Sequence, residues 1–281
     1  MITGLDHVVL LVKDIAQATA QYEALFGRSP SWRAAHDGAD NVFFTLENTS
    51  LELIAPGKGE RAEALAKQID DEGEGLKSIV FAVPNIAEMH RRARRLELAP
   101  EDVALRESKD EARGETRVWK SFRIAREKTH GPRLFFIEHD RPFALSPQTA
   151  PGAVFAIDHA VVSTPAPDRA AALYGARLGL DMALDRTNAD WGSRLMFFRC
   201  GDMIMEIAHN LKNGVGDGPD SVYGLTWRIA DADAAQARLK AGGFNVSDVR
   251  VGRKPGTKVF TVRDKTCGVP TLMLQPSPER D

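Results

Sequence analysis

The sequence has little of several features that would point to particular kinds of protein. It contains two cysteines, Cys200 and Cys267, among 281 residues, which excludes a disulfide framework and a cysteine-rich metal site. Its longest apolar run near the start, residues 8–12, is too short for a signal-peptide core or a membrane-spanning helix. A net charge of −2 gives no electrostatic reason to expect nucleic acid or an anionic membrane as a partner. We therefore expect a cytoplasmic protein that has neither of these partners.

What is present is the composition of an ordinary globular protein. Apolar residues make up 43% of the chain and charged residues 27%, which is typical of soluble domains. A chain of 281 residues can form one large domain or two ordinary ones. Further patterns must decide between these two arrangements.

The chain carries an internal repeat that favours two domains. An Asp-His pair occurs twice, with the histidines at His7 and His159, and each pair begins a strand-like apolar stretch. A helical segment, a stop at glycine, further strands and a glutamate follow in the same order in both copies. Glu52 lies 45 residues after the first histidine, and Glu206 lies 47 residues after the second. A repeated order of this kind indicates a duplication.

Each half is predicted to contain two modules of a strand, a helix and three strands, giving an α+β protein of four βαβββ modules. Asp14, Asn85 and Asp231 are predicted to cap helices, because each precedes an apolar pattern of helical period. A charged helix is expected at about 61–71, and the polar segment 101–115, which has no periodicity, is predicted to be an exposed loop. We predict domains at residues 1–140 and 154–276, with a proline-containing linker at 141–153.

Four short motifs carry a resemblance to a known superfamily. They are Asp-His-Val-Val at 6–9, Leu-Glu-Leu-Ile at 51–54, Asp-His-Ala-Val-Val at 158–162 and Met-Glu-Ile-Ala at 205–208. These motifs resemble those of the vicinal oxygen chelate superfamily, which includes glyoxalase I, extradiol dioxygenases and bleomycin-binding proteins. The first half, which also has Leu-Phe-Phe-Ile-Glu at 134–138, is similar to the glyoxalase-like domain group of that superfamily.

The resemblance implies two tandem cup-shaped sheets, each made of two modules, with a divalent metal ion on the floor of the cup. Its ligands would come from the first and last strands of each module. His7 and Glu52 match these positions in module one, and His159 and Glu206 match them in module three. The other two modules depart from the pattern, with Ser78 and Phe135 in module two, and Gly224 and Leu272 in module four.

Each cup therefore receives one histidine and one glutamate, whichever modules pair, and two interpretations stay open. A divalent ion (Fe, Zn, Mn or Ni) could bind in at least one cup, but catalytic metal sites usually have three protein ligands. Alternatively no metal binds, and each His–Glu pair is held by its own hydrogen bond and can act in acid–base chemistry. A third metal ligand would have to come from His36, His130, His139 or His209.

The resemblance implies an enzyme acting on a small oxygenated organic compound, as an isomerase, lyase or ring-cleaving dioxygenase. Glu52 and Glu206 are the predicted catalytic bases. The alternative is a protein that binds and sequesters a small molecule, as bleomycin-binding relatives do. The absence of histidine at Ser78 and Gly224 favours the binding protein, whereas the two retained His–Glu pairs favour the enzyme. One half could also be catalytic while the other serves as a scaffold.

Two further sets of residues are candidates for binding this small molecule. Arg253 and Lys254 lie in a turn at 252–257, where they could anchor a carboxylate or phosphate at the mouth of a cup, although a solvated turn is the simpler interpretation. Trp119 and Trp227 could stack on an aromatic substrate, although core packing is commoner for aromatic residues in sheets. The protein is expected to be a monomer or a homodimer.

Overall fold

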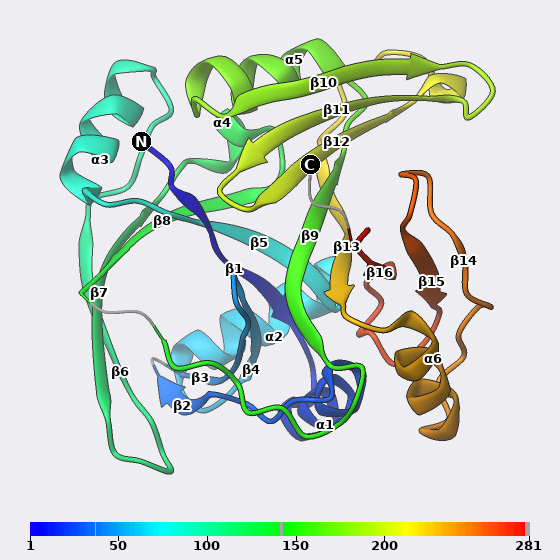
Figure 1. Cartoon of the computed structure of the whole chain (residues 1–281). Helices are drawn as coiled ribbons and strands as arrows, with labels where there is room; N and C mark the ends of the chain where they lie inside the picture. The colour runs from blue at the N-terminus through cyan, green and yellow to red at the C-terminus, as the bar shows by residue number, and fades with distance from the viewer. Residues whose placement is uncertain (37, 141–142, 279–281) are drawn as a thin grey trace.

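The computed structural model describes residues 1–36, 38–140 and 143–278. Within these residues the chain forms two eight-stranded sheets, one from each half (Figure 1). The two sheets repeat the same strand order, which confirms four βαβββ modules in two tandem domains. Modules one and two share the first sheet, and modules three and four share the second.

The first sheet closes into a cup. Its order is β2-β3-β4-β1-β5-β8-β7-β6, and the antiparallel pairing of β1 with β5 at the centre joins the two modules. The two edges come together, because Trp32 Nε1 on β2 donates to Ser108 Oγ on β6 at 3.1 Å. We call the concave face of this sheet the first cup. Its strands are β1 (Gly4–Leu11), β2 (Trp32–His36), β3 (Ala39–Thr45), β4 (Ser50–Pro56), β5 (Gly75–Ala82), β6 (Ala104–Lys109), β7 (Thr116–Arg123) and β8 (Arg133–His139).

The second sheet has the equivalent order β10-β11-β12-β9-β13-β16-β15-β14. Here β9 pairs in parallel with β12 and antiparallel with β13, as β1 does with β4 and β5. Its concave face is the second cup. Its strands are β9 (Val154–Ser163), β10 (Asp181–Asn188), β11 (Ser193–Cys200), β12 (Met203–Asn210), β13 (Ser221–Ile229), β14 (Arg250–Val251), β15 (Lys258–Val262) and β16 (Thr271–Gln275).

The predicted helix starts are confirmed. The side chains of Asp14, Asn85 and Asp231 each accept a hydrogen bond from a backbone N–H in the first turn of the helix that follows. This satisfies a donor that has no partner within the helix. The helices are α1 (Ile15–Phe26), α2 (Glu60–Glu72), α3 (Ile86–Arg95), α4 (Arg126–Thr129), α5 (Pro167–Ala171), which continues as a π-helical segment at Ala172–Arg177, a 3₁₀ turn at Leu211–Asn213, and α6 (Ala232–Ala241).

The prediction of an exposed loop at 101–115 is wrong in part. Residues Ala104–Lys109 form β6, an edge strand that pairs antiparallel with β7. Its outer side chains face solvent, and its inner positions, Arg106 and Ser108, line a cavity. Neither face is apolar, so the strand shows none of the alternation by which strands are recognised.

The convex faces of both sheets belong to one hydrophobic core. A single cluster of buried side chains extends through both halves of the chain. Phe26 at the end of α1 packs edge-on against Trp227 of β13, with ring centroids 4.8 Å apart, and both side chains are fully buried. The hydroxyl of Tyr22 donates to the carbonyl of Thr266 at 3.1 Å across the same junction. The two halves therefore pack against each other through the convex faces of their sheets, and the two cups face away from this shared core.

In the part of the chain described, no helix is long and apolar enough to cross a membrane.

Candidate active site

The first cup holds a cavity of about 410 Å³. Strand side chains point alternately to the two faces of a sheet, so every second residue of a strand reaches the concave face. On β1 these are His7, Val9 and Leu11, whereas Val8 and Leu10 are fully buried in the core behind. One face of helix α2 covers the cavity from the side.

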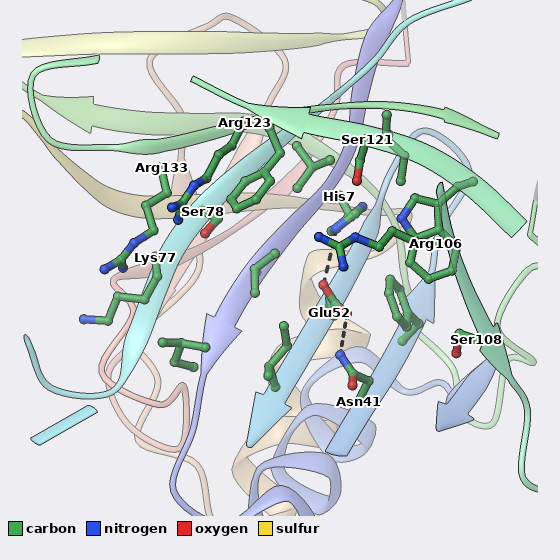
Figure 2. A pocket seen from close by; sticks show the side chains of 18 of the residues that line it. His7, Asn41, Glu52, Lys77, Ser78, Arg106, Ser108, Ser121, Arg123 and Arg133 are labelled. Carbon is green, nitrogen blue, oxygen red and sulfur yellow. Dashed lines mark hydrogen bonds and ion pairs between the residues drawn. The ribbon is translucent and has the colours of Figure 1, made fainter. Parts of the chain in front are cut away.

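A buried His–Glu pair lies on the wall of this cavity. His7 on β1 and Glu52 on β4 are 7% and 8% exposed, and His7 Nε2 lies 3.3 Å from Glu52 Oε2. The other ring nitrogen of His7, Nδ1, bonds to Asp6 Oδ1 at 2.6 Å. Asp6 therefore orients the imidazole so that Nε2 faces the glutamate. Figure 2 shows the pair pointing toward each other from neighbouring strands.

Glu52 is held from a second side. Asn41 Nδ2 on β3 donates to Glu52 Oε1 at 2.8 Å (Figure 2). Asn41 Oδ1 is buried and accepts no hydrogen bond within the described residues, so it can accept one from a ligand in the cavity. Each carboxylate oxygen of Glu52 thus has one fixed neighbour, and the residue lines the cavity.

The charges behind the pair stabilise a protonated imidazole. Burial alone would lower the pKa of His7, but the hydrogen bonds to Asp6 and Glu52 outweigh it and raise this pKa to about 9. Burial would likewise raise the pKa of Asp6, but contacts with His139, 3.0 Å away, and with His7 hold it far below its ordinary value. The group is thus a continuous chain of imidazole–carboxylate contacts, His139–Asp6–His7–Glu52.

The residues of the first cup do not fit a metal ion held by three protein ligands. Within residues 1–36, 38–140 and 143–278, no three His, Cys, Asp or Glu side chains converge on a point that could hold a metal. Ser78 and Phe135, at the two remaining superfamily ligand positions, line the cavity but add no carboxylate or imidazole. Of the proposed third ligands, His139 contacts Asp6 and His209 is buried against the carbonyl of Thr164.

The remaining proposed third ligands add nothing to this site. His130 ends α4, outside the lining of the cavity. The side chain of His36 lies outside the described part of the structure.

The second cup repeats the arrangement with looser contacts. His159 Nδ1 bonds to Asp158 Oδ2 at 2.8 Å, but His159 Nε2 lies 3.7 Å from Glu206 Oε2 and 2.8 Å from Thr226 Oγ1. Burial raises the pKa of Glu206, an effect that His159 and Arg253 partly offset. The histidine here is held by a threonine hydroxyl as well as by the two carboxylates, and both members of the pair are more exposed than in the first cup.

The structure places the four predicted substrate-binding residues in three different environments. Trp119 on β7 lines the first cup beside His139. Arg253 stacks on the ring of Trp191 at 4.1 Å in the second half, and Lys254 lies in the same exposed turn. Trp227 faces the core behind the second sheet, so it lines neither cup. Its neighbour Thr226, on the opposite face of β13, is the one that reaches into the second cup.

The sequence prediction missed the cationic residues of the first cup. Arg117 and Arg123 alternate with Val118 and Phe122 on β7, and alternation of this kind usually places the charged side chains in solvent. Here the face that would be solvated forms the inside of a closed cup. The curvature of the sheet, which the pattern of one strand cannot show, decides the environment of these residues.

Comparisons with known proteins agree with this fold. A family model described as glyoxalase-like domain matches residues 5–179, and a model described as glyoxalase/bleomycin resistance protein/dioxygenase superfamily matches residues 158–261. No curated protein matches the chain.

Several solved structures have a similar fold at low sequence identity. A mutant of 4-hydroxymandelate synthase from Streptomyces coelicolor is 12% identical, with 100% of this chain and 95% of that chain covered and a TM-score of 0.72. The Mn(II)-bound glyoxalase from Novosphingobium aromaticivorans is 16% identical, with 98% and 82% covered and a TM-score of 0.66. BphC, a halotolerant catechol dioxygenase, is 13% identical, with 100% and 89% covered and a TM-score of 0.65. The glyoxalase-like match spans more than half of the chain, and the chain therefore belongs to the glyoxalase-like domain family, within the vicinal oxygen chelate superfamily.

Proposed function

We propose that the protein is an enzyme that acts on a small oxygenated organic compound in the first cup, by proton transfer. The observation that carries this proposal is the buried His7–Glu52 pair on the wall of a cavity of about 410 Å³. A carboxylate and an imidazole have no reason to be inside an otherwise apolar strand pair unless they meet a partner or a ligand. Asp6 and Asn41 fix both members, as a catalytic constellation requires.

The proposed step is removal of a proton from a carbon next to a carbonyl group. Glu52 takes the proton, and the electron pair of the broken C–H bond gives an enolate whose oxygen carries the negative charge. That charge develops inside a cavity lined by more arginine and lysine than carboxylate side chains, and the positive potential there favours it. Return of the proton to another atom completes an isomerisation, and loss of a group from the adjacent carbon completes an elimination. His7, held by Asp6, donates to Glu52 and keeps it in place.

This proposal assigns the chemistry to the protein's own residues. The Mn(II)-bound glyoxalase has a metal, and a divalent ion in either cup of this chain stays a prediction of the family resemblance. An ion in the first cup would have His7 and Glu52 as protein ligands and would polarise an oxygen of the substrate. A catalytic metal site usually has three protein ligands, and the first cup offers two, His7 and Glu52. We therefore expect proton transfer to survive treatment with a chelator.

The second cup is proposed to act as a scaffold. Its His–Glu contact is longer, and Thr226 bonds to the ring nitrogen that faces the glutamate. The cytoplasmic location, the monomeric or homodimeric state and the domain limits at 1–140 and 154–276 stay predictions from the sequence.

Sequestration of a small molecule is the second candidate function. The observation that favours it is the replacement of two of the four superfamily ligand positions of the first cup by Ser78 and Phe135. A binding protein needs the cavity but no base, so the two candidates differ in whether Glu52 removes a proton.

Exchange of α-protons in D2O separates these candidates. The wild-type protein is incubated with acetophenone, 4-acetylbenzoate and 4-oxopentanoate, and NMR follows the loss of the α-proton signals. We expect exchange by the wild type and by the matched control Glu206→Gln, and a rate lower by at least about 100-fold in Glu52→Gln. Equal rates in wild type and Glu52→Gln would refute the proposal. Saturable binding of these compounds without exchange would favour sequestration instead.

A further inference from the structure

The first cup concentrates positive charge that the chain as a whole lacks. The net charge of the protein is −2. Among the described side chains that line the cavity, Glu52 is the only carboxylate, whereas six are arginine or lysine. The six are Arg61, Lys77, Arg106, Arg117, Arg123 and Arg133.

One row across the sheet connects the catalytic base with a guanidinium. Glu52 on β4 lies beside Val9 on β1, Val9 beside Ser78 on β5, and Ser78 beside Arg133 on β8. Neighbouring strands are about 4.8 Å apart, so three strand spacings separate the backbones of Glu52 and Arg133 by about 14 Å along the sheet. Side chains from both ends occupy part of this span, and the middle is left for the body of a ligand.

The adjacent row also runs from a residue of the His–Glu pair, through apolar residues, to an arginine. His7 lies beside Val80, Val80 beside Phe135, and Phe135 beside Arg123 on β7. Val9 and Val80 form a small apolar cluster on the concave face, against which Phe135 packs. The floor of the cavity thus changes from a proton-transfer pair, through an apolar strip, to two guanidinium groups. Figure 2 shows Lys77, Arg123 and Arg133 together, away from His7 and Glu52.

The guanidinium groups keep donors for a ligand. Two nitrogens of Arg133 bond to the carboxylate of Glu72 on α2, each at 3.0 Å, and a guanidinium has five N–H donors. Arg123 Nε bonds to Glu101 at 2.6 Å, but both side chains are about half exposed, and such surface pairs contribute little. Neither carboxylate fills the space over the apolar strip, since neither lines the cavity.

The ammonium of Lys77 adds to the excess of positive charge at this end. It donates to the backbone carbonyl of Glu72 at 2.8 Å. Burial lowers the pKa of Lys77, and the neighbouring charges of Arg133 and Arg126 lower it further, while Glu72 acts in the opposite direction. An anion bound between Lys77 and Arg133, which both line the cavity, would relieve the repulsion between these two cations.

We propose that the substrate of the first cup is an organic acid whose carboxylate binds Arg123, Arg133 and Lys77, and whose apolar body lies on Val9, Val80 and Phe135. Its oxygenated, reacting end then lies at His7 and Glu52. This inference rests on the proposed function only in placing the reacting end of the substrate at Glu52. The carboxylate site is defined separately, by Arg123, Arg133 and Lys77.

The probe is 4-acetylbenzoate, which carries an acetyl group, an aromatic ring and a carboxylate in this order. The control compound is 4-acetylbenzamide, in which a neutral amide replaces the carboxylate. Calorimetric titration of the whole protein measures the binding of both. We expect the acid to bind at least about tenfold more tightly than the amide, as loss of a charge-assisted contact predicts. Arg123→Gln and Arg133→Gln should each reduce the ratio of acid affinity to amide affinity by about tenfold. Arg133→Lys, which keeps the charge, should reduce this ratio less than Arg133→Gln does.

Arg126→Gln is the matched control, because Arg126 bonds to the same Glu72 carboxylate at 2.9 Å but does not line the cavity. It should bind the acid as the wild type does, and thermal denaturation verifies that each variant folds. Equal binding of acid and amide, no binding of the acid, or wild-type binding by both Arg→Gln variants would overturn the inference.

The two proposals fail separately. Arg-dependent binding of 4-acetylbenzoate with no α-proton exchange would sustain the carboxylate site and refute proton transfer. Glu52-dependent exchange that is equally fast with 4-acetylbenzamide would sustain proton transfer and refute the carboxylate site.

Discussion

Replacement of Asp6 by asparagine should lower the pKa of His7 and destabilise the protein in a defined pH range. Asp6 contacts His7 at 2.6 Å and His139 at 3.0 Å, and the pKa of His7 lies at about 9 instead of 6.5. Loss of an opposite charge at this distance lowers the pKa of a histidine by about 1–3 units, which corresponds to about 1.4–4 kcal/mol. Glu52 remains beside His7, so part of the shift should persist.

The direction of the pH effect follows from the two pKa values. A histidine whose pKa is raised from 6.5 to about 9 stabilises the fold fully below pH 6.5, and this contribution is lost as the pH rises through about 9. Asp6, whose pKa is lowered, stabilises the fold above its ordinary pKa of 3.8 and loses this effect only in stronger acid. The wild type should therefore exceed Asp6→Asn in stability most clearly between about pH 4 and 6.5, and the difference should shrink toward pH 9 and above.

Side-chain NMR of metal-free protein measures the titration of His7, and urea unfolding at several pH values measures the stability. Asp158→Asn is a matched control in the second cup, where Asp158 contacts His159 in the same way. It should leave the titration of His7 unchanged. A wild-type His7 that titrates near 6.5, or an unchanged titration in Asp6→Asn, would refute this reasoning.

Three further predictions concern the core and the two cups. Phe26→Ala should lower the free energy of unfolding by about 3–5 kcal/mol, because the ring is fully buried against Trp227, and urea unfolding should stay a single transition; two separate transitions would contradict the shared core. Asn41→Ala should slow α-proton exchange by about tenfold or more while binding of 4-acetylbenzoate changes less, because the amide orients Glu52; equal losses of both would contradict this role. Glu206→Gln should raise the melting temperature at pH 8 relative to the wild type more than at pH 4, because burial raises the pKa of this carboxyl and its ionisation opposes folding; a lower melting temperature at pH 8 would contradict this.

The repeat and the helix boundaries could be predicted because they depend on local patterns. Asp14, Asn85 and Asp231 cap helices through contacts within the first turn, which a short sequence window contains. The equivalence of His7 and His159 could be recognised because duplicated strands keep the same order of residues. Pairing of modules within each half could not be decided, since it depends on which strands meet at the centre of each sheet.

Which side chains line the first cup depends on contacts between distant segments, and the sequence alone predicts these contacts less well than it predicts helix boundaries. Arg106, Arg123 and Arg133 come from the consecutive strands β6, β7 and β8, which share a cavity with His7 on β1 and Glu52 on β4 only once the sheet has closed. In the sequence, each of these arginines resembles a charged residue on the solvent-exposed face of a strand. As an aromatic residue on a strand, Trp227 is a candidate both for stacking on a substrate and for the core, and its register with β9 places it in the core.

A crystal structure with 4-acetylbenzoate tests the proposed site of the first cup most directly. The expected result is electron density in the first cup, with the carboxylate within hydrogen-bond distance of Arg123 or Arg133. The acetyl group should lie beside Glu52, and the ring should lie over Val9 and Val80. A ligand bound in the second cup only, or bound in the first cup with its carboxylate against Glu52, would contradict both the location of the site and the direction in which the substrate binds.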